Sequence, residues 1–203
     1  MSPRPYSMEK REAAASETRQ RILEAARQVL AEESETTLSM DAIARRADVS
    51  RLTIYYQFES RPGLLEALYD HLASRGGMQR MPEVFRESDP SKALDKLVSV
   101  FVGFWSSDRV VIRHLRAMAA LDPEIREGIQ SRDARRQHIV RQIVKRIAAA
   151  RKRKYADEDF GAAADVIAML SGFATYDALA TAGHSEKEII VIITRLVHFA
   201  ASE

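Results

Sequence analysis

Turn-forming residues are scarce in this chain, which has only 8 glycines and 6 prolines among its 203 residues. Together they make up about 7% of the sequence, against a usual value of about 12%. A chain with few turn residues can make few chain reversals. This favours long helices over many short strands. Apolar residues recur at helical spacing, as at Ile22, Ala26 and Val29, and no segment reads as a strand. The sequence therefore predicts an all-α fold.

Capping residues and apolar spacing together predict nine helices, which begin near residues 16, 39, 50, 60, 89, 108, 122, 157 and 185. Residues 1–15 contain two prolines and no apolar period, so we expect a flexible arm there. The first three helices are short compared with those that follow. We therefore expect a small N-terminal domain at 16–60 and a larger helical domain at 61–203.

The composition excludes several kinds of chemistry. The chain has no cysteine, which rules out disulfides, thiolate nucleophiles and cysteine zinc sites. Its five histidines lack metal-binding spacing, and no glycine-rich phosphate loop or nucleophile motif is present. We therefore expect no metal, no cofactor and no catalytic residue, so the chain is not predicted to be an enzyme.

Targeting signals are also missing from the sequence. The most apolar run, residues 189–201, is shorter than the ~20 residues that a membrane span needs. The first sixteen residues carry basic side chains with no apolar run behind them, unlike a secretory signal. We therefore expect a soluble, cytoplasmic protein that does not bind membranes.

The most specific pattern lies at the start of the third expected helix. Ser39 and Ser50 are good N-caps, and the two short helices that they begin form a helix-turn-helix pattern. Residues 47–58 read ADVSRLTIYYQF, and their Val-Ser-x-x-Thr-Ile-Tyr-x-x-Phe core resembles the signature of TetR-family transcriptional regulators. By motif the resemblance covers about residues 17–72. It implies a nine-helix fold, with an N-terminal three-helix DNA-binding domain and a larger domain that binds a ligand and dimerises.

Three positions depart from the usual pattern of this family. Asp48 stands where glycine is common, Gln57 where histidine or tyrosine is common, and Pro62 where an acidic residue or lysine is common. Aspartate tolerates the left-handed backbone conformation that glycine adopts in such a turn. The departures therefore concern the details of DNA recognition rather than the family.

The helix that begins at Ser50 is expected to enter the major groove of double-stranded DNA. Its spacing turns Val49, Ile54 and Phe58 toward the core and Arg51, Leu52 and Tyr55 outward. In the groove Arg51 can bond the edge of a guanine, and Leu52 can contact a thymine methyl group. These two residues are the predicted base-reading positions.

The family resemblance adds contacts with the DNA backbone. It implies phosphate contacts for Thr53, Tyr55 and Arg61, which match the family's motif positions. For Tyr55 and Tyr56, aromatic packing in the core is the alternative interpretation. The full set of expected DNA-binding residues is Ser50, Arg51, Leu52, Thr53, Tyr55, Tyr56 and Arg61.

Affinity for DNA must come from the local placement of charge. The whole chain has a formal net charge of +2, and residues 1–61 hold ten basic and ten acidic side chains. Arg45, Arg46, Arg51 and Arg61 nevertheless lie close to the expected recognition helix. A positive patch can therefore form there although the domain as a whole is neutral.

A second basic run, residues 132–154, holds ten basic side chains and one acid, Asp133. We favour the solvated face of a long helix whose opposite, buried row contains Ile139, Ile143 and Ile147. A nucleic-acid or acidic membrane surface is one alternative. A site that attracts an anionic effector is the other.

The long helices are expected to hold a small-molecule pocket and a homodimer interface, as the resemblance implies. Apolar and aromatic side chains suit a pocket for an apolar or aromatic effector, although plain core packing is the alternative for each of them. The candidate ligand-binding residues are Phe85, Leu97, Phe101, Phe104, Trp105, His114, Met118 and Ile125. A row of small residues and a final helix that is apolar nearly all round predict the interface. Its candidate residues are Ala164, Ala168, Gly172, Ile189, Ile193 and Leu196.

These expectations combine into a ligand-responsive DNA-binding repressor, a homodimer that a small effector releases from a palindromic operator. Two alternatives remain open. One is a module with a helix-turn-helix shape that binds another protein, and the other is a regulator or activator that needs no ligand.

Overall fold

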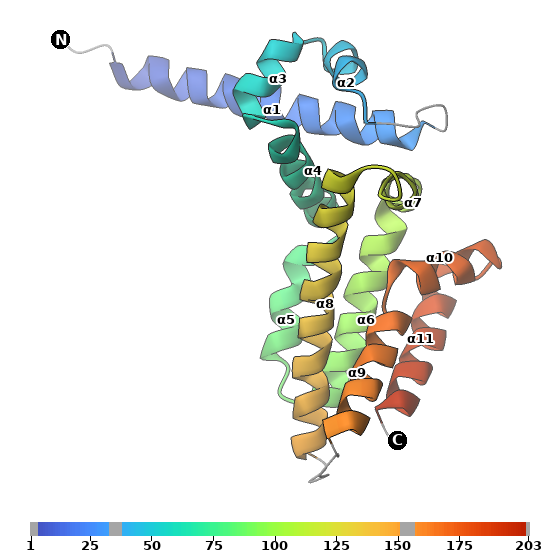
Figure 1. The fold of residues 1–203 in the computed structure, drawn as a ribbon. Helices are drawn as coiled ribbons and strands as arrows, with labels where there is room; N and C mark the ends of the chain where they lie inside the picture. Colours follow the sequence, from blue (N-terminus) through green and yellow to red (C-terminus); the bar gives the residue numbers. More distant parts are fainter. Residues whose placement is uncertain (1–3, 33–37, 151–156, 202–203) are drawn as a thin grey trace. The chain divides into compact units, whose positions relative to one another are not determined.

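The computed structural model describes residues 4–32, 38–150 and 157–201, which form eleven α-helices and one short 3-10 helix, with no strand among them (Figure 1). The all-α prediction is confirmed, although the helices outnumber the nine expected. The chain divides into two compact units. Unit 1 comprises Met1–Leu72 and Val110–Gly128, and unit 2 comprises Ala73–Arg109 and Ile129–Glu203. Unit 1 thus includes residues 61–72 and 110–128 in addition to the segment 16–60 that was expected as the N-terminal domain.

Unit 1 is built around three N-terminal helices that pack on one another (Figure 1). Its helices are α1 (Arg4–Ala31), α2 (Met40–Ala47), α3 (Arg51–Phe58), most of α4 (Arg61–Arg75), most of α7 (Arg109–Met118) and the start of α8 (Pro123–Ala150). Its fully buried core includes Ile22, Ile43, Ile54 and Leu68. The apolar residues that the sequence placed on one face of the first helix are therefore buried, and α1 packs against α2 and α3.

Unit 2 consists mainly of longer helices. They are η1 (Met78–Arg80), α5 (Met81–Arg86), α6 (Pro90–Ser107), the rest of α8, α9 (Asp157–Leu170), α10 (Phe173–Thr181) and α11 (Glu186–Ala200). Helix α11 packs against α6 and α9, and α5 packs against α6. Leu94 and Leu97 on α6, Ile143 on α8 and Ile193 on α11 are fully buried.

Three expectations about secondary structure are corrected. Helix α1 begins at Arg4, so residues 4–15 are helical rather than a flexible arm. Helices η1 and α5 occupy a stretch where no helix was expected. The long helix expected at 157–183 is broken at Gly172, whose backbone is extended with φ −83° and ψ 163°.

The break between α9 and α10 is held by side chains from other helices. The guanidinium of Arg136, which is buried on α8, donates to the Ala168 carbonyl and, at 3.3 Å, to the Ser171 hydroxyl. The indole N–H of Trp105 donates to the Ser171 carbonyl at 3.1 Å. These donors come from distant parts of the chain and satisfy carbonyl groups at the end of α9, which is why local sequence did not reveal the break.

The small-residue row predicted as a dimer surface faces the chain's own interior. Ala164, Ala168 and Gly172 are buried, and a Cβ atom added at Gly172 would lie 3.4 Å from Nη2 of Arg136. The small side chains therefore make room for an arginine of the same chain. They are not available to a second copy, which corrects that part of the interface prediction.

The last helix departs from the interface prediction in the same way. Ile189 and Ile193 are buried because α11 packs on α6 and α9. Leu196 alone among the six candidate residues is on the surface, with 44% of its area exposed.

The second basic run begins on α8, where Arg135, Arg141 and Lys145 are exposed. Ile143 and Ile147 are buried and Ile139 is half-buried, as the solvated-face interpretation predicts. Among the described basic side chains of the run, Arg132 and Arg146 are half-buried and Arg136 is buried in unit 2, while the others are exposed. The basic residues 151–154 lie outside the described residues.

Among the described residues, no single helix has both the length and the apolar character to cross a membrane, and the one pair that reaches the threshold together, Gly161–Leu170 with Phe173–Thr181, is bent by 44°. The same residues contain no group of three or more histidine, aspartate or glutamate side chains arranged to hold a metal ion.

The turn between α2 and α3 confirms the expectation for Asp48. This residue ends α2 in the left-handed conformation with φ 51° and ψ 53°, and its backbone N–H is 3.3 Å from the Arg45 carbonyl. The next amide, that of Val49, donates to the Ala44 carbonyl at 3.0 Å. The two bonds satisfy carbonyl groups at the helix end and reverse the chain toward α3.

Replacing Asp48 with valine is expected to lower the free energy of unfolding by about 1–2 kcal/mol, because a β-branched side chain is disfavoured at positive φ. Asparagine tolerates this conformation, so Asp48→Asn should change the free energy by less than about 0.5 kcal/mol. Urea unfolding of the three proteins measures both effects. An equal loss in the two variants would show that the carboxylate, rather than the backbone conformation, stabilises the turn.

Candidate nucleic-acid interface

Two serine caps start the two helices of the helix-turn-helix. The Ser39 hydroxyl accepts a hydrogen bond from the Ala42 amide at 3.2 Å, and the Ser50 hydroxyl accepts one from the Thr53 amide at 3.0 Å. The Ser50 and Thr53 hydroxyl oxygens are also 2.8 Å apart. Each cap supplies a partner for an amide that the first turn of a helix leaves unbonded, which fixes where α2 and α3 begin.

Helix α3 has one buried face and one exposed face. Ile54 is fully buried and Phe58 is 4% exposed, as the spacing predicts. On the other face, Leu52 is 78% exposed and Tyr56 is 87% exposed. The core-packing alternative is therefore wrong for Tyr56, while Tyr55 is half-buried.

The Arg51 side chain lies between a carboxylate and a phenol. Its Nη1 atom is 3.6 Å from Oδ1 of Asp41 on α2, and its Nη2 atom donates to the Tyr55 hydroxyl at 3.4 Å. The guanidinium carbon lies 5.8 Å from the centroid of the Tyr55 ring. The hydrogen bond to Tyr55 and the charge of Asp41 raise the pKa of Arg51 above the ordinary value of an arginine. The group is therefore charged and remains solvent-exposed, as binding to an anion requires.

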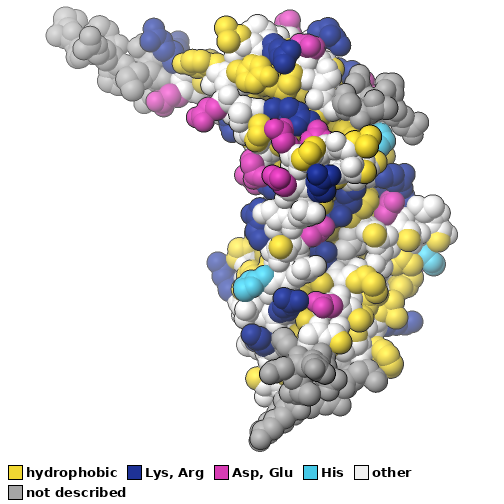
Figure 2. Space-filling view, viewed as in Figure 1, with side chains coloured by type: hydrophobic (Ala, Val, Ile, Leu, Met, Phe, Trp, Pro, Cys, Tyr) yellow, Lys and Arg dark blue, Asp and Glu magenta, His cyan; other side chains and the backbone are white. Residues whose placement is uncertain are grey.

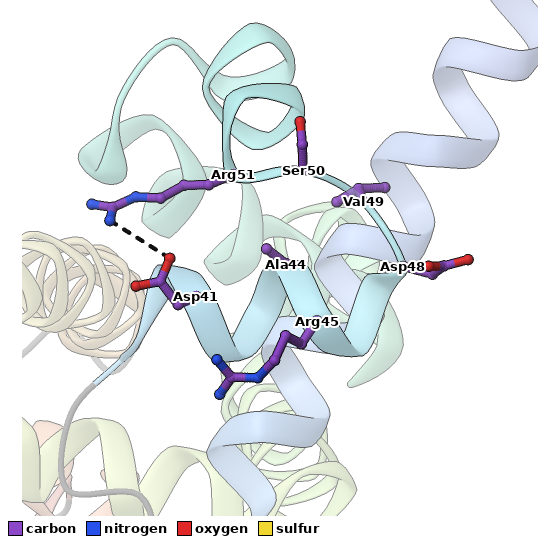
Figure 3. A pocket seen from close by; sticks show the side chains of 7 residues that line it. All are labelled: Asp41, Ala44, Arg45, Asp48, Val49, Ser50 and Arg51. Atoms are coloured by element: carbon purple, nitrogen blue, oxygen red, sulfur yellow. Dashed lines mark ion pairs between the residues drawn. The ribbon is translucent and has the colours of Figure 1, made fainter.

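A shallow, open hollow lies between α2 and α3 (Figure 3). Its lining residues are Asp41, Ala44, Arg45, Asp48, Val49, Ser50 and Arg51. In Figure 3 the side chains of Asp41 and Arg51 point toward each other, while Asp48 points to the opposite side. Asp41 thus places a negative charge beside the arginine predicted to read bases, a feature that sequence analysis missed.

The end of α3 is tied to α1. The Arg19 guanidinium donates to the Gln57 carbonyl and lies over the Phe58 ring, with 4.1 Å between its central carbon and the ring centroid. One arginine therefore satisfies a carbonyl at the end of α3 and covers its last buried side chain. Nothing in the sequence pattern had singled out Arg19.

Arg61, a predicted phosphate contact, lies at the first position of α4 and is already held by two carboxylates. Its Nη2 atom is 2.5 Å from Oδ2 of Asp122, and its Nη1 atom pairs with Glu124. The side chain is 24% exposed. Arg61 is therefore part of an ion-pair cluster within unit 1.

The candidate ligand residues are divided between the two units. Five of them, Phe85, Leu97, Phe101, Phe104 and Trp105, belong to unit 2, and the other three, His114, Met118 and Ile125, belong to unit 1. The Phe85 side chain is 51% exposed, whereas Leu97 is fully buried. In unit 1, Nδ1 of His114 donates to the Leu30 carbonyl at 2.6 Å, so this ring nitrogen already has a partner.

An aromatic cluster in unit 2 surrounds Trp105. The Trp105 ring centroid is 6.0 Å from that of Phe101, 4.6 Å from that of Phe104 and 5.6 Å from that of Phe173 on α10. Tyr176 extends the cluster, 6.3 Å from Phe173. Both α10 residues were absent from the sequence-based set.

The surface of α9 and α11 carries exposed apolar side chains. Hydrophobic side chains gather over this part of the molecule in Figure 2. Those with the largest exposed areas are Val166 and Met169 on α9 and Val191, Leu196 and Phe199 on α11. We call these five residues the α9/α11 apolar face.

Comparison with known proteins identifies the N-terminal segment. A family model described as bacterial regulatory proteins, tetR family, matches residues 22–68. The transcriptional regulator SrpR of Pseudomonas putida is 44% identical over 63 residues, which cover 31% of this chain and 28% of SrpR. The regulator EthR of Mycolicibacterium smegmatis is 31% identical over 132 residues, which cover 62% of this chain and 55% of EthR. The matches thus span about a quarter to a half of these relatives.

Solved structures extend the likeness to nearly the whole chain. A TetR transcription regulator from Haloarcula marismortui matches with a TM-score of 0.69 at 16% identity, over 92% of this chain and 97% of that one. LfrR of Mycobacterium smegmatis, a TetR-like regulator solved in complex with proflavine, matches with a TM-score of 0.55 at 26% identity, over 91% of this chain and 96% of LfrR. Residues 22–68 of this chain therefore match the TetR family of transcriptional regulators, and the chain as a whole has the fold of TetR-like regulators.

Proposed function

We propose that this regulator is a repressor that binds a palindromic DNA operator through α3 and is released by a small aromatic or apolar effector. The observation that carries the proposal is the exposed face of α3. A helix that enters the major groove must offer polar and apolar groups to base edges while its other face stays packed. Arg51 and Leu52 offer these groups, and Ile54 and Phe58 are buried on the opposite face of the helix.

Basic side chains near α3 support an interaction with phosphates. Arg45 and Arg46 at the end of α2 are exposed, and Arg46 pairs with Glu32, the residue that follows α1. Phosphates compete with such carboxylates for exposed arginines, because a surface ion pair contributes only about 0–1 kcal/mol. The zero net charge of residues 1–61 is therefore compatible with binding to DNA.

Removing one side chain from α3 at a time is expected to separate base reading from backbone binding. Arg51→Ala should change the preferred bases, with a loss of about 1–3 kcal/mol at the affected position. Tyr55→Phe removes a hydroxyl group and should weaken all sequences about equally. Fluorescence anisotropy at two salt concentrations, with DNA from just upstream of the coding region and with scrambled DNA, measures both effects.

The exposed residue Arg135 on α8 provides a matched control, because Arg135→Ala removes the same charge from unit 2. If Arg51→Ala weakens every sequence equally, the base-reading role is refuted. Absence of DNA binding by the wild-type protein at low salt, for this DNA and for sequences selected from random DNA, would favour a protein-interaction module instead.

The aromatic cluster around Trp105 supports the proposed effector class. LfrR, whose fold resembles this chain, is solved with the flat aromatic compound proflavine. An effector releases DNA only to the extent that it prefers the conformation that binds DNA poorly. Because proflavine also binds DNA directly, its binding is measured on the protein without DNA, as a rise in the thermal unfolding midpoint, and a ligand-independent regulator would show no rise.

The α9/α11 apolar face supports a homodimer. Exposed apolar residues on two adjacent helices, with 62% of Met169 and 66% of Phe199 accessible, are typical of a surface that another protein covers. A two-fold axis would match the symmetry of a palindromic operator. We propose this face as the interface in place of the buried residues predicted from the sequence.

A charge placed in this face is expected to separate the two copies. The wild-type protein should sediment as a dimer at micromolar concentration, and Met169→Asp should shift it toward the 22.9 kDa monomer. Leu121→Asp is the matched control, since Leu121 is 90% exposed in unit 1, outside the face. A wild-type protein that sediments only as a monomer would refute the interface.

A further inference from the structure

The ion-pair cluster at Arg61 joins parts of unit 1 that are far apart in sequence. Arg61 opens α4, directly after the helix-turn-helix, while Asp122 and Glu124 lie at the start of α8. Asp122 is within reach of both guanidinium nitrogens, with Nη2–Oδ2 at 2.5 Å and Nη1–Oδ1 at 3.4 Å. Glu124 bonds Nη1 as well. An arginine held by two carboxylates has a fixed orientation, because its planar group is bonded on more than one edge.

Asp122 has a second task in the same place. Its Oδ1 atom accepts hydrogen bonds from the amides of Glu124 at 3.1 Å and Ile125 at 3.2 Å, so it caps α8. Partial burial raises the pKa of this carboxyl, but the hydrogen bond from Arg61 and the two amides outweigh it and hold the pKa below its usual value. One carboxylate thus fixes both the start of α8 and the position of Arg61.

A second contact ties α4 to the first turns of α8. The Tyr69 hydroxyl donates to the Ile125 carbonyl at 3.2 Å, and both residues are buried. The Tyr69 ring packs against Gly128, where an added Cβ atom would be only 2.6 Å from Cε2 of the ring. The two helices are therefore joined at two levels, by Arg61 and by Tyr69.

The connection from α4 to α3 is short and tight. Only Glu59 and Ser60 separate the two helices, and Glu59 has a φ of 65°. A Cβ atom added at Gly63 would lie 2.1 Å from the Phe58 carbonyl oxygen, so the first turn of α4 sits directly against the end of α3. A displacement of Arg61 is therefore expected to displace α3 as well.

From this arrangement we propose that Asp122 and Glu124 are positioning residues for DNA binding, which hold Arg61 and thereby set the orientation of α3. The inference rests on the proposed function. It assigns Arg61 to this cluster, whereas the family resemblance implied that Arg61 contacts a DNA phosphate. It also gives two acidic residues, more than sixty positions beyond α3 in the sequence, a role in binding an anion.

The two roles of Arg61 make opposite predictions for its acidic partners. If Arg61 binds a phosphate, neutralising Asp122 or Glu124 frees the guanidinium and removes repulsion, so DNA binding should tighten. If the acids position α3, the same changes should weaken binding. Asp122→Asn and Glu124→Gln are suitable probes, because asparagine also caps helices and each change keeps the side-chain shape.

The measurement is the affinity for operator DNA, by anisotropy over a series of salt concentrations, for the full-length protein and its variants. We expect Asp122→Asn and Glu124→Gln each to weaken binding about three- to tenfold, in line with the loss of a partly buried charged hydrogen bond. The slope of log affinity against log salt should stay unchanged in both variants, because no phosphate contact is lost. Glu127→Gln, which neutralises an exposed acid on the same helix, is the matched control and should not weaken binding.

A double-mutant cycle with Arg61→Gln provides the second readout. Once Arg61 is replaced, neutralising Asp122 or Glu124 should cause no further loss of affinity. Tighter binding by Asp122→Asn and Glu124→Gln, or a salt slope reduced by about one in Arg61→Gln, would overturn the inference in favour of a phosphate contact. Affinities unchanged in both acidic variants would overturn it as well. Failure of the wild-type protein to bind any DNA would instead refute the proposed function.

Discussion

An eight-residue helix such as α3 does not hold its shape in water, because isolated helices shorter than about 12–15 residues are only marginally stable. The exposed face of α3 therefore depends on the burial of Ile54 and Phe58 against the rest of unit 1. Each of these side chains contributes about 1.5–3 kcal/mol when it leaves water. The Ser50 cap and the Arg19 contact then fix the two ends of the helix. Recognition by α3 is thus a property of the whole unit.

Local features of this unit could be predicted from the sequence. The caps at Ser39 and Ser50, the left-handed turn at Asp48 and the buried pair on α3 all follow from residues a few positions apart. Helix spacing and capping act between residues a few positions apart, so the sequence pattern is enough to predict these features. The outward positions of Arg51 and Leu52 were found in the same way.

Contacts between distant segments could not be predicted. Arg61 matched a phosphate-binding position of the family motif, but its carboxylate partners lie more than sixty residues away, at a helix start that the sequence marked only as a cap. The small row that includes Ala168 looks the same in sequence whether a second copy or the chain's own Arg136 fills the space. Spacing shows that a helix face is buried or tightly packed, but it does not show which partner covers it.

We infer that α3 and the start of α8 act as one body when the protein binds DNA. Hydrogen exchange of backbone amides, measured with and without operator DNA, tests this most directly. We expect DNA to slow exchange in residues 51–58 and also in residues 123–128, which include Glu124, a partner of Arg61, and Ile125, the partner of Tyr69. Slower exchange confined to residues 51–58, with 123–128 unchanged, would contradict it.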